Sequence, residues 1–385
     1  MMHPVLIAGG GLAGLTAARL LHRAGFDFVL LEARERLGGR ILSADAAGDP
    51  SDDGFDLGPS WFWPGMHPAM AALVEGLGLS GFPQASEGDV IVQRTPRDAP
   101  QRYRGLRQEP QSMRLAGGTG ALIRALAADL PASRLRLDAR VRRVVRDGQE
   151  VEVSFAGADG PERTIRASHV VFALPPRLLE AGVSFSPALD AATIRRWRET
   201  PTWMAPHAKV FALYDRPFWR DAGLSGMAQS MTGPLVEVHD ATTASGKAAL
   251  FGFVGVPAEQ RRVVGQDAIV RACVQQLAAL FGPEAASPVA TLFKDWAADP
   301  LTATADDRVA GGHPRLDPRP WVSGAWQDHL FLAGSETSST APGYLAGAVE
   351  AAGRAVTAIV RGPGASAAGA SDGAPSGWAR GETDR

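Results

Sequence analysis

Three glycines near the start of the chain have the spacing of a phosphate-binding turn. Gly9, Gly11 and Gly14 follow a short apolar run, Val5 to Ala8, and open a stretch with helical apolar spacing, Leu12 to Leu21. In such a turn the first glycine makes the bend, the second lets the backbone approach a pyrophosphate, and the third lets the helix pack closely. The helix N-terminus would offer free N–H groups and a partial positive charge to the phosphates. The stretch therefore predicts a dinucleotide site.

A carboxylate and a cation follow at useful positions. A second apolar run, Phe28 to Leu31, ends on Glu32, where a carboxylate can accept both ribose hydroxyls of an adenosine. The alternative, a packed βαβ unit that binds no ligand, would not explain why position 11 is a glycine and position 32 a carboxylate. The next segment, ERLGGR at 35–40, ends on Arg40, which can reach back to the pyrophosphate or the flavin. This extension resembles the two-dinucleotide-binding flavoproteins and favours FAD over NAD.

Length and charge exclude several classes of partner. The chain has 385 residues, enough for two domains with a sizeable core. Its formal charge of −2 gives no indication of binding to nucleic acid or to an anionic membrane surface. No apolar run reaches the ~18 residues of a membrane anchor, and the first strand begins too early for a signal peptide. We expect a cytoplasmic enzyme; the sequence carries no signal for an oligomeric state.

Cysteine and lysine are both rare. Cys273 is the only cysteine and lies in the apolar stripe of a predicted helix, so we expect it to pack in the core. Only three of the 39 basic residues are lysines, at 209, 247 and 294. A lysine retained in such an arginine-rich chain is a candidate for a role that needs its amine, although drift explains some survivors equally well.

The alternation of strand and helix patterns predicts an α/β fold in two domains. One is a discontinuous Rossmann-like FAD-binding domain, and the other is a mixed α+β substrate domain. From residue 362 onward the composition is rich in Gly, Ala, Ser and Pro, which predicts a disordered tail over 362–385. The predicted segments are 1–77, 113–200 and 320–361 for the FAD domain, and 78–112 and 201–319 for the substrate domain.

The elements that position the chemistry include several buried strands and two long helices. Residues 53–68 combine turn formers with the three consecutive aromatics Trp61, Phe62 and Trp63, and predict a loop that passes the isoalloxazine. The helices are predicted at Gln266 to Phe281 and Tyr344 to Val360. The predicted strands include Val90 to Arg94, Gln101 to Gly105, Glu150 to Phe155, Arg163 to Ala167, His169 to Leu174, Ala208 to Tyr214, Leu250 to Val254, Thr291 to Trp296 and His329 to Gly334.

Further stretches resemble the flavin-containing amine oxidase family, which includes monoamine and polyamine oxidases and L-amino-acid oxidases. They occur in the family's order and cover nearly the whole chain before the tail. The resemblance implies oxidative deamination: a hydride passes from the amine's α-carbon to flavin N5, the imine hydrolyses, and O₂ yields hydrogen peroxide. The stretches are Asp56 to Trp61, Leu115 to Gly118, His169 to Pro176, Lys209 with Tyr214 and Phe218-Trp219, Lys294 to Trp296, Phe331 to Thr337, and Gly343-Tyr344.

The resemblance also implies roles for residues along the cofactor. Glu32 would bind the adenosine ribose, Arg34 and Arg40 would lie along the cofactor, and the backbone of Val141 would hold the adenine. Glu336 would bind the ribityl–pyrophosphate region, and the N-terminus of the last helix would point at the flavin pyrimidine. The predicted cofactor-binding residues are Gly9, Gly11, Gly14, Glu32, Arg34, Gly39, Arg40, Val141, Gly334, Glu336 and Gly343.

Two residues carry the implied catalysis. Lys209 matches the family's lysine that holds a water at flavin N5, although a surface lysine on an edge strand is the plainer alternative. Tyr344 matches one wall of the aromatic cage that steers the amine, and core packing is its alternative. Trp61, Trp203 and Trp296 either line the pocket or simply pack.

The chain departs from the family pattern in three places. The second cage wall is expected about ten residues past Trp296, but residues 305–307 are Ala-Asp-Asp. No cysteine lies in the flavin-attachment loop, so we expect non-covalent FAD; no metal site is predicted. The segment 78–112 is also short. The missing wall keeps open a flavin desaturase or oxidase acting on a carbon skeleton, and a non-catalytic flavin-binding partner subunit is a third interpretation.

Overall fold

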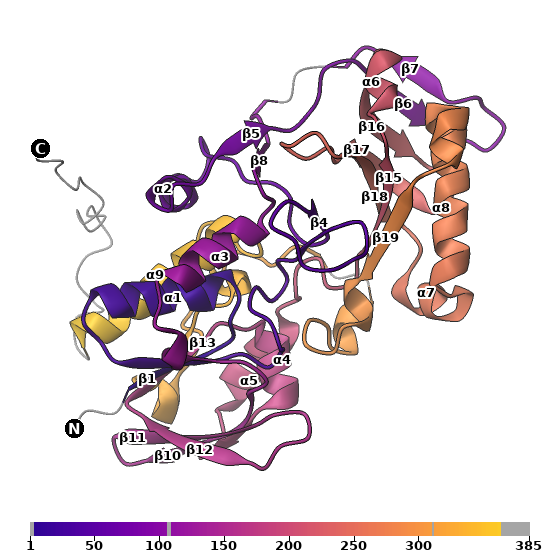
Figure 1. Ribbon diagram of the computed structural model, residues 1–385. Helices are drawn as coiled ribbons and strands as arrows, with labels where there is room; N and C mark the ends of the chain where they lie inside the picture. Colours follow the sequence, from indigo (N-terminus) through magenta and orange to yellow (C-terminus); the bar gives the residue numbers. More distant parts are fainter. Residues whose placement is uncertain (1–3, 106–108, 310–311, 363–385) are drawn as a thin grey trace, which may run out of the picture.

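The computed structural model describes residues 4–105, 109–309 and 312–362 (Figure 1). The predicted disordered tail, apart from Gly362, lies outside the described residues. The described chain is arranged in two parts, one around the N-terminal strand and one around a large sheet. Among the described residues, no helix has the length and apolar character needed to cross a bilayer.

The glycine-rich stretch folds as predicted, into strand, turn, helix and strand. β1 (Val5–Ala8) leads into α1 (Leu12–Arg23), and the chain returns through β2 (Phe28–Leu31), which pairs with β1 in parallel. Every residue of both strands is buried, because the sheet is covered on both faces. This double burial explains why each strand reads as an unbroken apolar run.

A parallel sheet of five strands forms around β1. Its order is β20-β13-β1-β2-β9, and each neighbouring pair runs in parallel. The helices α1 and α9 (Leu345–Arg361) pack together on this sheet and share one hydrophobic core with it. The remaining strands of this sheet are β9 (Leu135–Arg136), β13 (His169–Phe172) and β20 (Leu330–Leu332).

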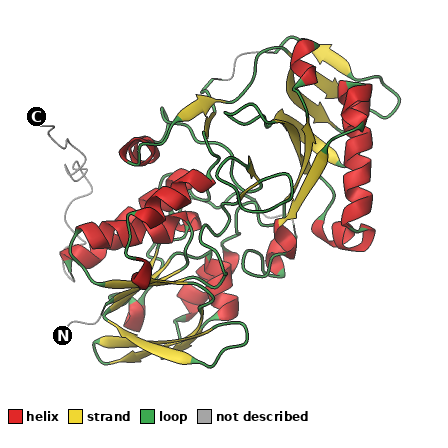
Figure 2. Cartoon of the chain, viewed as in Figure 1, coloured by secondary structure: helices red, strands yellow, loops and turns green. Residues whose placement is uncertain are grey.

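A smaller sheet lies under the other face and shares the second core cluster with the first sheet (Figure 2). Its order is β12-β11-β10-β14, and the register shifts between Val141 and Arg143 of β10. The strands are β10 (Arg140–Asp147), β11 (Glu150–Ala156), β12 (Arg163–Ala167) and β14 (Ser184–Ser186).

The second part is built on a sheet of seven strands, with the order β19-β15-β18-β17-β16-β6-β7. All seven fall within the segments 78–112 and 201–319, and we propose the division into two domains on that basis. The strands are β6 (Asp89–Gln93), β7 (Gln101–Tyr103), β15 (Ala208–Tyr214), β16 (Leu224–Ser230), β17 (Leu235–Asp240), β18 (Ala248–Val254) and β19 (Ala290–Asp295).

The two faces of this sheet have different neighbours. The helix α8 (Gln266–Phe281), with the bounds that the sequence predicts, packs on one face and contributes Cys273 to the core there. The opposite face carries Phe211 and Phe251, which pack against β4 (Phe55–Asp56) and the residues after it. This second face looks toward the first part of the molecule. It is the face on which the functional residues lie.

The remaining helices connect the sheets, and two short ladders join distant loops. β3 (Ser43–Ala44) pairs with β4, and β5 (Gly81–Pro83) pairs with β8 (Met113–Leu115). The remaining helices are α2 (Pro68–Gly76), α3 (Gly120–Ala128), α4 (Pro176–Gly182), α5 (Ala191–Glu199), α6 (Phe218–Asp221), α7 (Ala258–Val264) and α9 (Leu345–Arg361).

Neither β16 nor β17 is predicted from the sequence. Gly226 and Gly233 interrupt the segment as turn formers would, and both adopt a positive φ. The ladder between β17 and β18 also changes register after Leu235, which breaks the alternation of apolar and polar residues. The pattern of a regular strand is therefore absent at the place where the structure has two.

Candidate functional site

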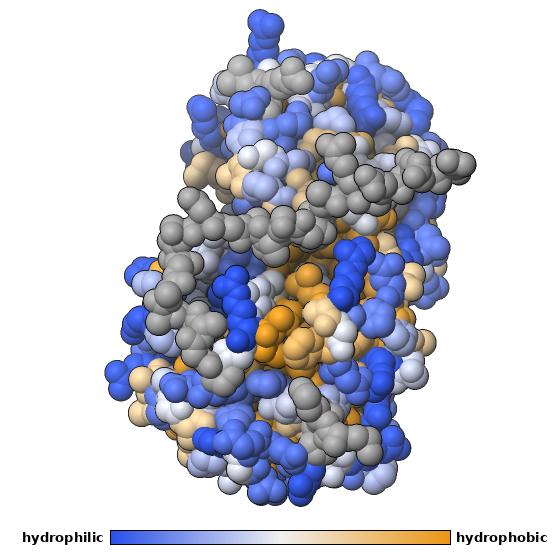
Figure 3. Space-filling model, turned by 90° about the vertical axis from the view of Figure 1, so that its left-hand side faces the viewer, coloured by the Kyte–Doolittle hydropathy of each residue, from blue (hydrophilic) through white to orange (hydrophobic). Residues whose placement is uncertain are grey.

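One cavity of about 590 Å³ runs between the two parts of the molecule. One end is lined by the glycine turn and Glu32, and the other by Lys209 and Phe253. Figure 3 shows an apolar area between the two parts on one face, bordered by hydrophilic side chains. Most of the predicted site residues line the cavity: Gly9, Gly11, Glu32, Arg34, Gly39, Arg40, Trp61, Val141, Trp203, Lys209, Trp296, Gly334, Gly343 and Tyr344.

The three glycines of the turn are required for different reasons. Gly9 has φ +109°, which side-chain-bearing residues rarely adopt. A Cβ on Gly14 would lie 1.8 Å from the Gly9 carbonyl oxygen, so Gly14 sets the contact of helix and strand. A Cβ on Gly11 would meet nothing closer than the Gly38 oxygen at 3.7 Å. The protein itself therefore has room for a Cβ at Gly11. A glycine is needed there only if a bound group in the cavity approaches the backbone closely.

Glu32 is buried at the end of β2 and is held by the backbone. The Gly10 N–H donates to its Oε2 at 2.6 Å, and the Arg34 N–H donates to its Oε1 at 2.8 Å. A carboxylate oxygen can accept more than one hydrogen bond, so both oxygens remain able to receive hydroxyl groups. Glu32 is thus fixed in position and still has acceptor capacity at the cavity.

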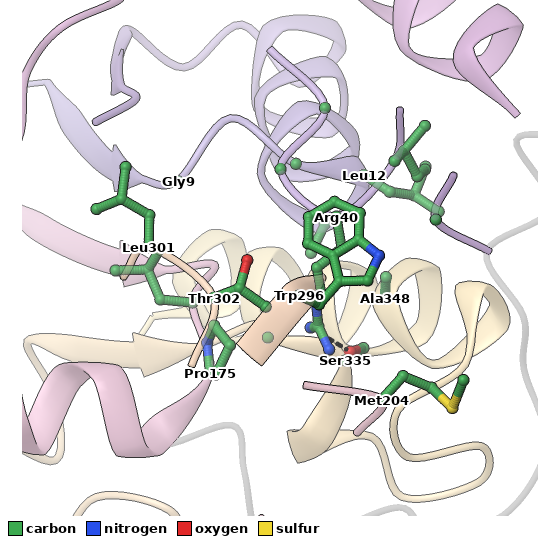
Figure 4. A pocket seen from close by; sticks show the side chains of 18 of the residues that line it. Gly9, Leu12, Arg40, Pro175, Met204, Trp296, Leu301, Thr302, Ser335 and Ala348 are labelled. Carbon is green, nitrogen blue, oxygen red and sulfur yellow. Dashed lines mark hydrogen bonds between the residues drawn. The ribbon is translucent and has the colours of Figure 1, made fainter. Parts of the chain in front are cut away.

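The two predicted arginines are bound to acidic residues that lie far away in the sequence. Arg34 donates to both oxygens of Asp299 at 3.0 Å and to Thr302 at 3.0 Å. Arg40 donates to Oε1 of Glu336 at 2.6 Å, and also to Ser335 (Figure 4). These contacts connect the first βαβ unit to the second half of the chain.

Glu336 differs from the sequence prediction in its immediate surroundings. It is fully buried in the turn after β20 and does not line the cavity itself. Its carboxylate holds the Arg40 guanidinium, which is a cavity-lining group. The geometry therefore gives Glu336 a positioning role through Arg40, and its direct contact with the cofactor stays a prediction.

The start of α9 is directed at the cavity. Gly343, Tyr344 and Leu345 line it, and Gly343 has φ +82°, where a Cβ would lie 2.7 Å from Cβ of Trp203. The free N–H groups of a helix N-terminus favour negative charge on a bound group. Gly334 packs equally closely, because a Cβ there would lie 2.3 Å from the Leu174 carbonyl oxygen.

Lys209 is buried in the cavity wall, on a strand with neighbours on both sides. The alternative of a surface lysine on an edge strand is therefore wrong. Its Nζ donates to the carbonyl oxygens of Gly58 at 2.6 Å and Asp56 at 3.3 Å, and to Oγ of Ser60 at 3.1 Å. Burial lowers the pKa of Lys209 to about 7, although nearby Asp56 acts to raise it.

Asp56 is a buried carboxylate behind Lys209. Its Oδ1 accepts from Ser43 at 2.6 Å and from the N–H and hydroxyl of Thr119, while its Oδ2 is buried without a partner among the described residues. Burial raises the pKa of Asp56, opposed by the hydrogen bond from Ser43 and the charge of Arg114. The loop 56–60 is thereby held to β3, to the start of α3 and to Lys209.

Tyr344 stands at the cavity with about a third of its surface exposed, so core packing does not explain it. Its ring lies 5.9 Å from Trp63 and 5.1 Å from His313, between ring centroids. His313 in turn contacts Trp203 at 4.4 Å. Asp307, in the segment where the second wall is expected, is buried and binds Arg177 instead.

The three tryptophans all line the cavity and also pack. Trp61 contacts His239 at 4.8 Å and Phe251 at 5.6 Å, and its Nε1–H donates to Gln84. Trp296 is buried, donates to the Leu57 carbonyl at 3.0 Å, and is labelled in the close-up of the cavity (Figure 4). Each of these tryptophans therefore lines the cavity and also packs against neighbouring residues.

These surroundings fit a dinucleotide cofactor laid along the cavity. The empty space at Gly11 and the fixed carboxylate of Glu32 suit a pyrophosphate and a ribose. Val141 lies at the same end, since it lines the cavity and the nearby Ala139 N–H donates to the Glu32 carbonyl oxygen at 2.8 Å. We propose that the redox-active ring lies beside the α9 N-terminus and Lys209, both of which line the cavity. Among the described residues no group of three or more potential metal ligands exists.

Comparisons with known proteins decide the family. A family profile described as flavin containing amine oxidoreductase matches residues 12–107 and 97–360. The chain belongs to this family. It is 26% identical to a putative flavin-containing monoamine oxidase of Mycobacterium tuberculosis, over 92% of this chain and 96% of the relative. A putrescine oxidase of Kocuria rosea is 25% identical over 77% of this chain and 83% of its own length.

Solved structures show the same fold. A putrescine oxidase with putrescine bound superposes with a TM-score of 0.76 at 20% identity, covering 94% of this chain and 99% of that chain. Membership of the family makes this chain an FAD-dependent amine oxidoreductase with an α/β fold. Cys273, the sole cysteine, is a buried residue of α8 and is not among the cavity-lining residues.

Several cavity residues are absent from the sequence predictions. Glu237 and Val236 lie on β17, which is not predicted, so no pattern points to them. His207 precedes Lys209 by two residues and lines the cavity on the same side of the strand. Trp63 stands in the predicted isoalloxazine loop, and its contact with Tyr344 depends on tertiary structure alone.

Proposed function

We propose that this amine oxidoreductase is an oxidase, which deaminates its substrate and passes the electrons to O₂. In the overall reaction an amine, O₂ and water give a carbonyl compound, ammonia or a smaller amine, and hydrogen peroxide. FAD, when bound, supplies the two-electron acceptor that takes the hydride from the amine's α-carbon. We further propose that FAD is held without a covalent bond, since Cys273 is buried away from the cavity.

Lys209 carries this proposal. Its three acceptors would use all three N–H bonds of an ammonium and so hold the head group at a fixed point of the cavity wall. A cation placed in advance stabilises the negative charge that develops on O₂ as it is reduced. The contact with the Asp56 oxygen, at 3.3 Å, is the longest of the three and is the one most readily exchanged for a water.

The rest of the cavity positions the amine. Trp61, Trp203 and Tyr344 present ring surfaces that exclude water and orient an uncharged amine. No side chain is assigned as a general base, because hydride loss from a neutral amine does not require one. The names of the relatives, a monoamine oxidase and a putrescine oxidase, support an amine substrate without selecting one.

The test separates the two half-reactions. Lys209→Met keeps the length of the side chain and removes its polar head. We expect anaerobic reduction by an amine to stay within about twofold, and reoxidation by O₂ to slow by roughly 100-fold. Stopped-flow absorbance measures both steps. Lys247→Met is the matched control, because Lys247 is half-exposed and pairs with Asp53 away from the cavity. Unchanged reoxidation in Lys209→Met would show that Lys209 only anchors the loop 56–60.

A further inference from the structure

A second carboxylate lines the cavity at the end opposite to Glu32. Glu237 on β17 faces it together with Val236 and Phe253. Glu32 and Glu237 are the two acidic residues among the described cavity-lining residues. Both oxygens of Glu32 are held by backbone N–H groups at the nucleotide end. Glu237 is therefore the carboxylate available at the end where an amine would react.

The register of the sheet places Glu237 relative to Lys209. Lys209 of β15 pairs with Phe253 of β18, and Phe253 pairs with Glu237 of β17. Residues paired in this way point to the same face of the sheet. Neighbouring strands lie about 4.8 Å apart, so Lys209 and Glu237 are separated by roughly 10 Å between Cα atoms. The ring of Phe253 lies between them on the cavity face.

A β-bulge directs Glu237 into the cavity. Leu235 pairs with Val254 and Glu237 pairs with the next residue, Phe253, so Val236 is the extra residue on β17. In a regular strand consecutive side chains point to opposite faces, yet both Val236 and Glu237 line the cavity. Bulges redirect side chains in this manner beside functional sites.

The carboxylate is held in place by a buried histidine. Oε1 of Glu237 lies 2.7 Å from Nε2 of His239, and Nε2 must carry the hydrogen because an ionised carboxylate only accepts. His239 is itself fixed between the rings of Trp61 at 4.8 Å and Phe251 at 5.3 Å. The hydrogen bond from His239 lowers the pKa of Glu237, so the group is ionised at neutral pH. Among the described residues, Oε2 has no hydrogen-bond partner.

We propose that Glu237 binds a second cationic group of the substrate, an ammonium joined to the reacting amine by a short aliphatic chain. The Glu237 side chain is 45% exposed, so its carboxylate is accessible, and the neighbouring lining is apolar, with Val236, Phe253 and Trp61. An ionised carboxylate forms its strongest hydrogen bonds with a cationic donor. The same apolar lining suits the methylene groups between the two nitrogens. This assignment rests on the proposed oxidation of an amine at the Lys209 end.

The test compares two amines of equal length. Putrescine carries a second ammonium where pentylamine carries a methyl group. We expect the unmodified holoenzyme to prefer putrescine by about 100-fold in kcat/KM, from peroxide release at neutral pH. Glu237→Gln keeps the acceptor for His239 and removes the charge. This substitution should lower kcat/KM for putrescine by roughly 30- to 100-fold, and kcat/KM for pentylamine should stay within about threefold of the unmodified enzyme.

The outcomes separate this assignment from the proposed function. Glu259→Gln, on the exposed surface of α7, is the control and should leave kcat/KM unchanged for both amines. Equal losses for both amines in Glu237→Gln would overturn the assignment and leave Glu237 as a support for His239 and Trp61. Equal use of both amines by the unmodified enzyme would also overturn it, while amine oxidation stands. If neither these two amines nor any other reduces the flavin, both proposals fail.

Discussion

The two ends of the cavity are constructed in different ways. At the nucleotide end most of the lining comes from one continuous stretch, residues 9–40, and Glu32 is held there by backbone N–H groups. Asp299 and Glu336 add side-chain contacts to the two arginines of this stretch. At the opposite end Lys209, Phe253 and Glu237 come from three strands, and the contacts are made by side chains. The nucleotide end therefore depends on local conformation, whereas the substrate end depends on sheet register and on a loop more than 140 residues away in sequence.

The largest effect is expected at the nucleotide end. Gly11→Leu should abolish retention of FAD, because the side chain would fill the space that a pyrophosphate needs. The chain itself has room there, so the purified variant should fold and be colourless. The ratio of flavin absorbance to protein absorbance and the far-UV circular dichroism measure these two properties.

Gly14→Ala is the matched control for this prediction. Its Cβ would lie 1.8 Å from a backbone oxygen of Gly9, so the damage should appear as lost folding, with lost cofactor as a secondary result. Full retention of FAD in Gly11→Leu would contradict the assignment of this turn to the pyrophosphate.

At the substrate end a pH dependence of intermediate size is expected. Burial lowers the pKa of Lys209 to about 7, so raising the pH through 7 removes the positive charge that we propose stabilises reduced oxygen. The rate of reoxidation by O₂ should therefore fall by about tenfold between pH 6 and pH 8, in proportion to the protonated fraction. In Lys209→Met the rate of reoxidation by O₂ should be low and independent of pH over this range. A wild-type rate that rises with pH would contradict the role of a cationic Lys209.

The smallest effect is expected at Tyr344. Tyr344→Ala should lower amine-dependent flavin reduction by roughly twofold to tenfold and leave the FAD content near normal, since only one ring surface is lost. The rate of flavin reduction in Tyr344→Phe should stay within about twofold of wild type, because in our proposal the ring face, and not the hydroxyl, contacts the substrate. Anaerobic stopped-flow measures the reduction. Equal activity of Tyr344→Ala and wild type would place the substrate elsewhere in the cavity.

The sequence predicts the nucleotide end well because its requirements are local. The bounds of β1 and β2 agree with the apolar runs, and the bounds of α8 agree with the predicted helix. Burial on both faces makes a parallel strand visible as a continuous apolar run, and a glycine turn is visible by its spacing. Membership of the family could likewise be inferred from motifs that recur in order.

The substrate end could be predicted only in part, because tertiary contacts determine it. Lys209 could be singled out as a rare lysine in a strand, but its three acceptors in the loop 56–60 could not. Glu237 was not predicted, since a bulge and two glycines conceal its strand. The ring that contacts Tyr344 most closely belongs to His313, far along a loop without periodicity.

The bulge at Val236 has a consequence for changing the enzyme's substrate range. An extra residue outside the ladder can be replaced without altering the pairing of its neighbours, so side chains of different volume at Val236 should be accepted at little cost in stability. Val236 and Glu237 together then form an adjustable pair, one setting the depth of the cavity and the other its charge. Libraries restricted to these two adjacent codons would sample chain length and charge of the amine while leaving the cofactor end untouched.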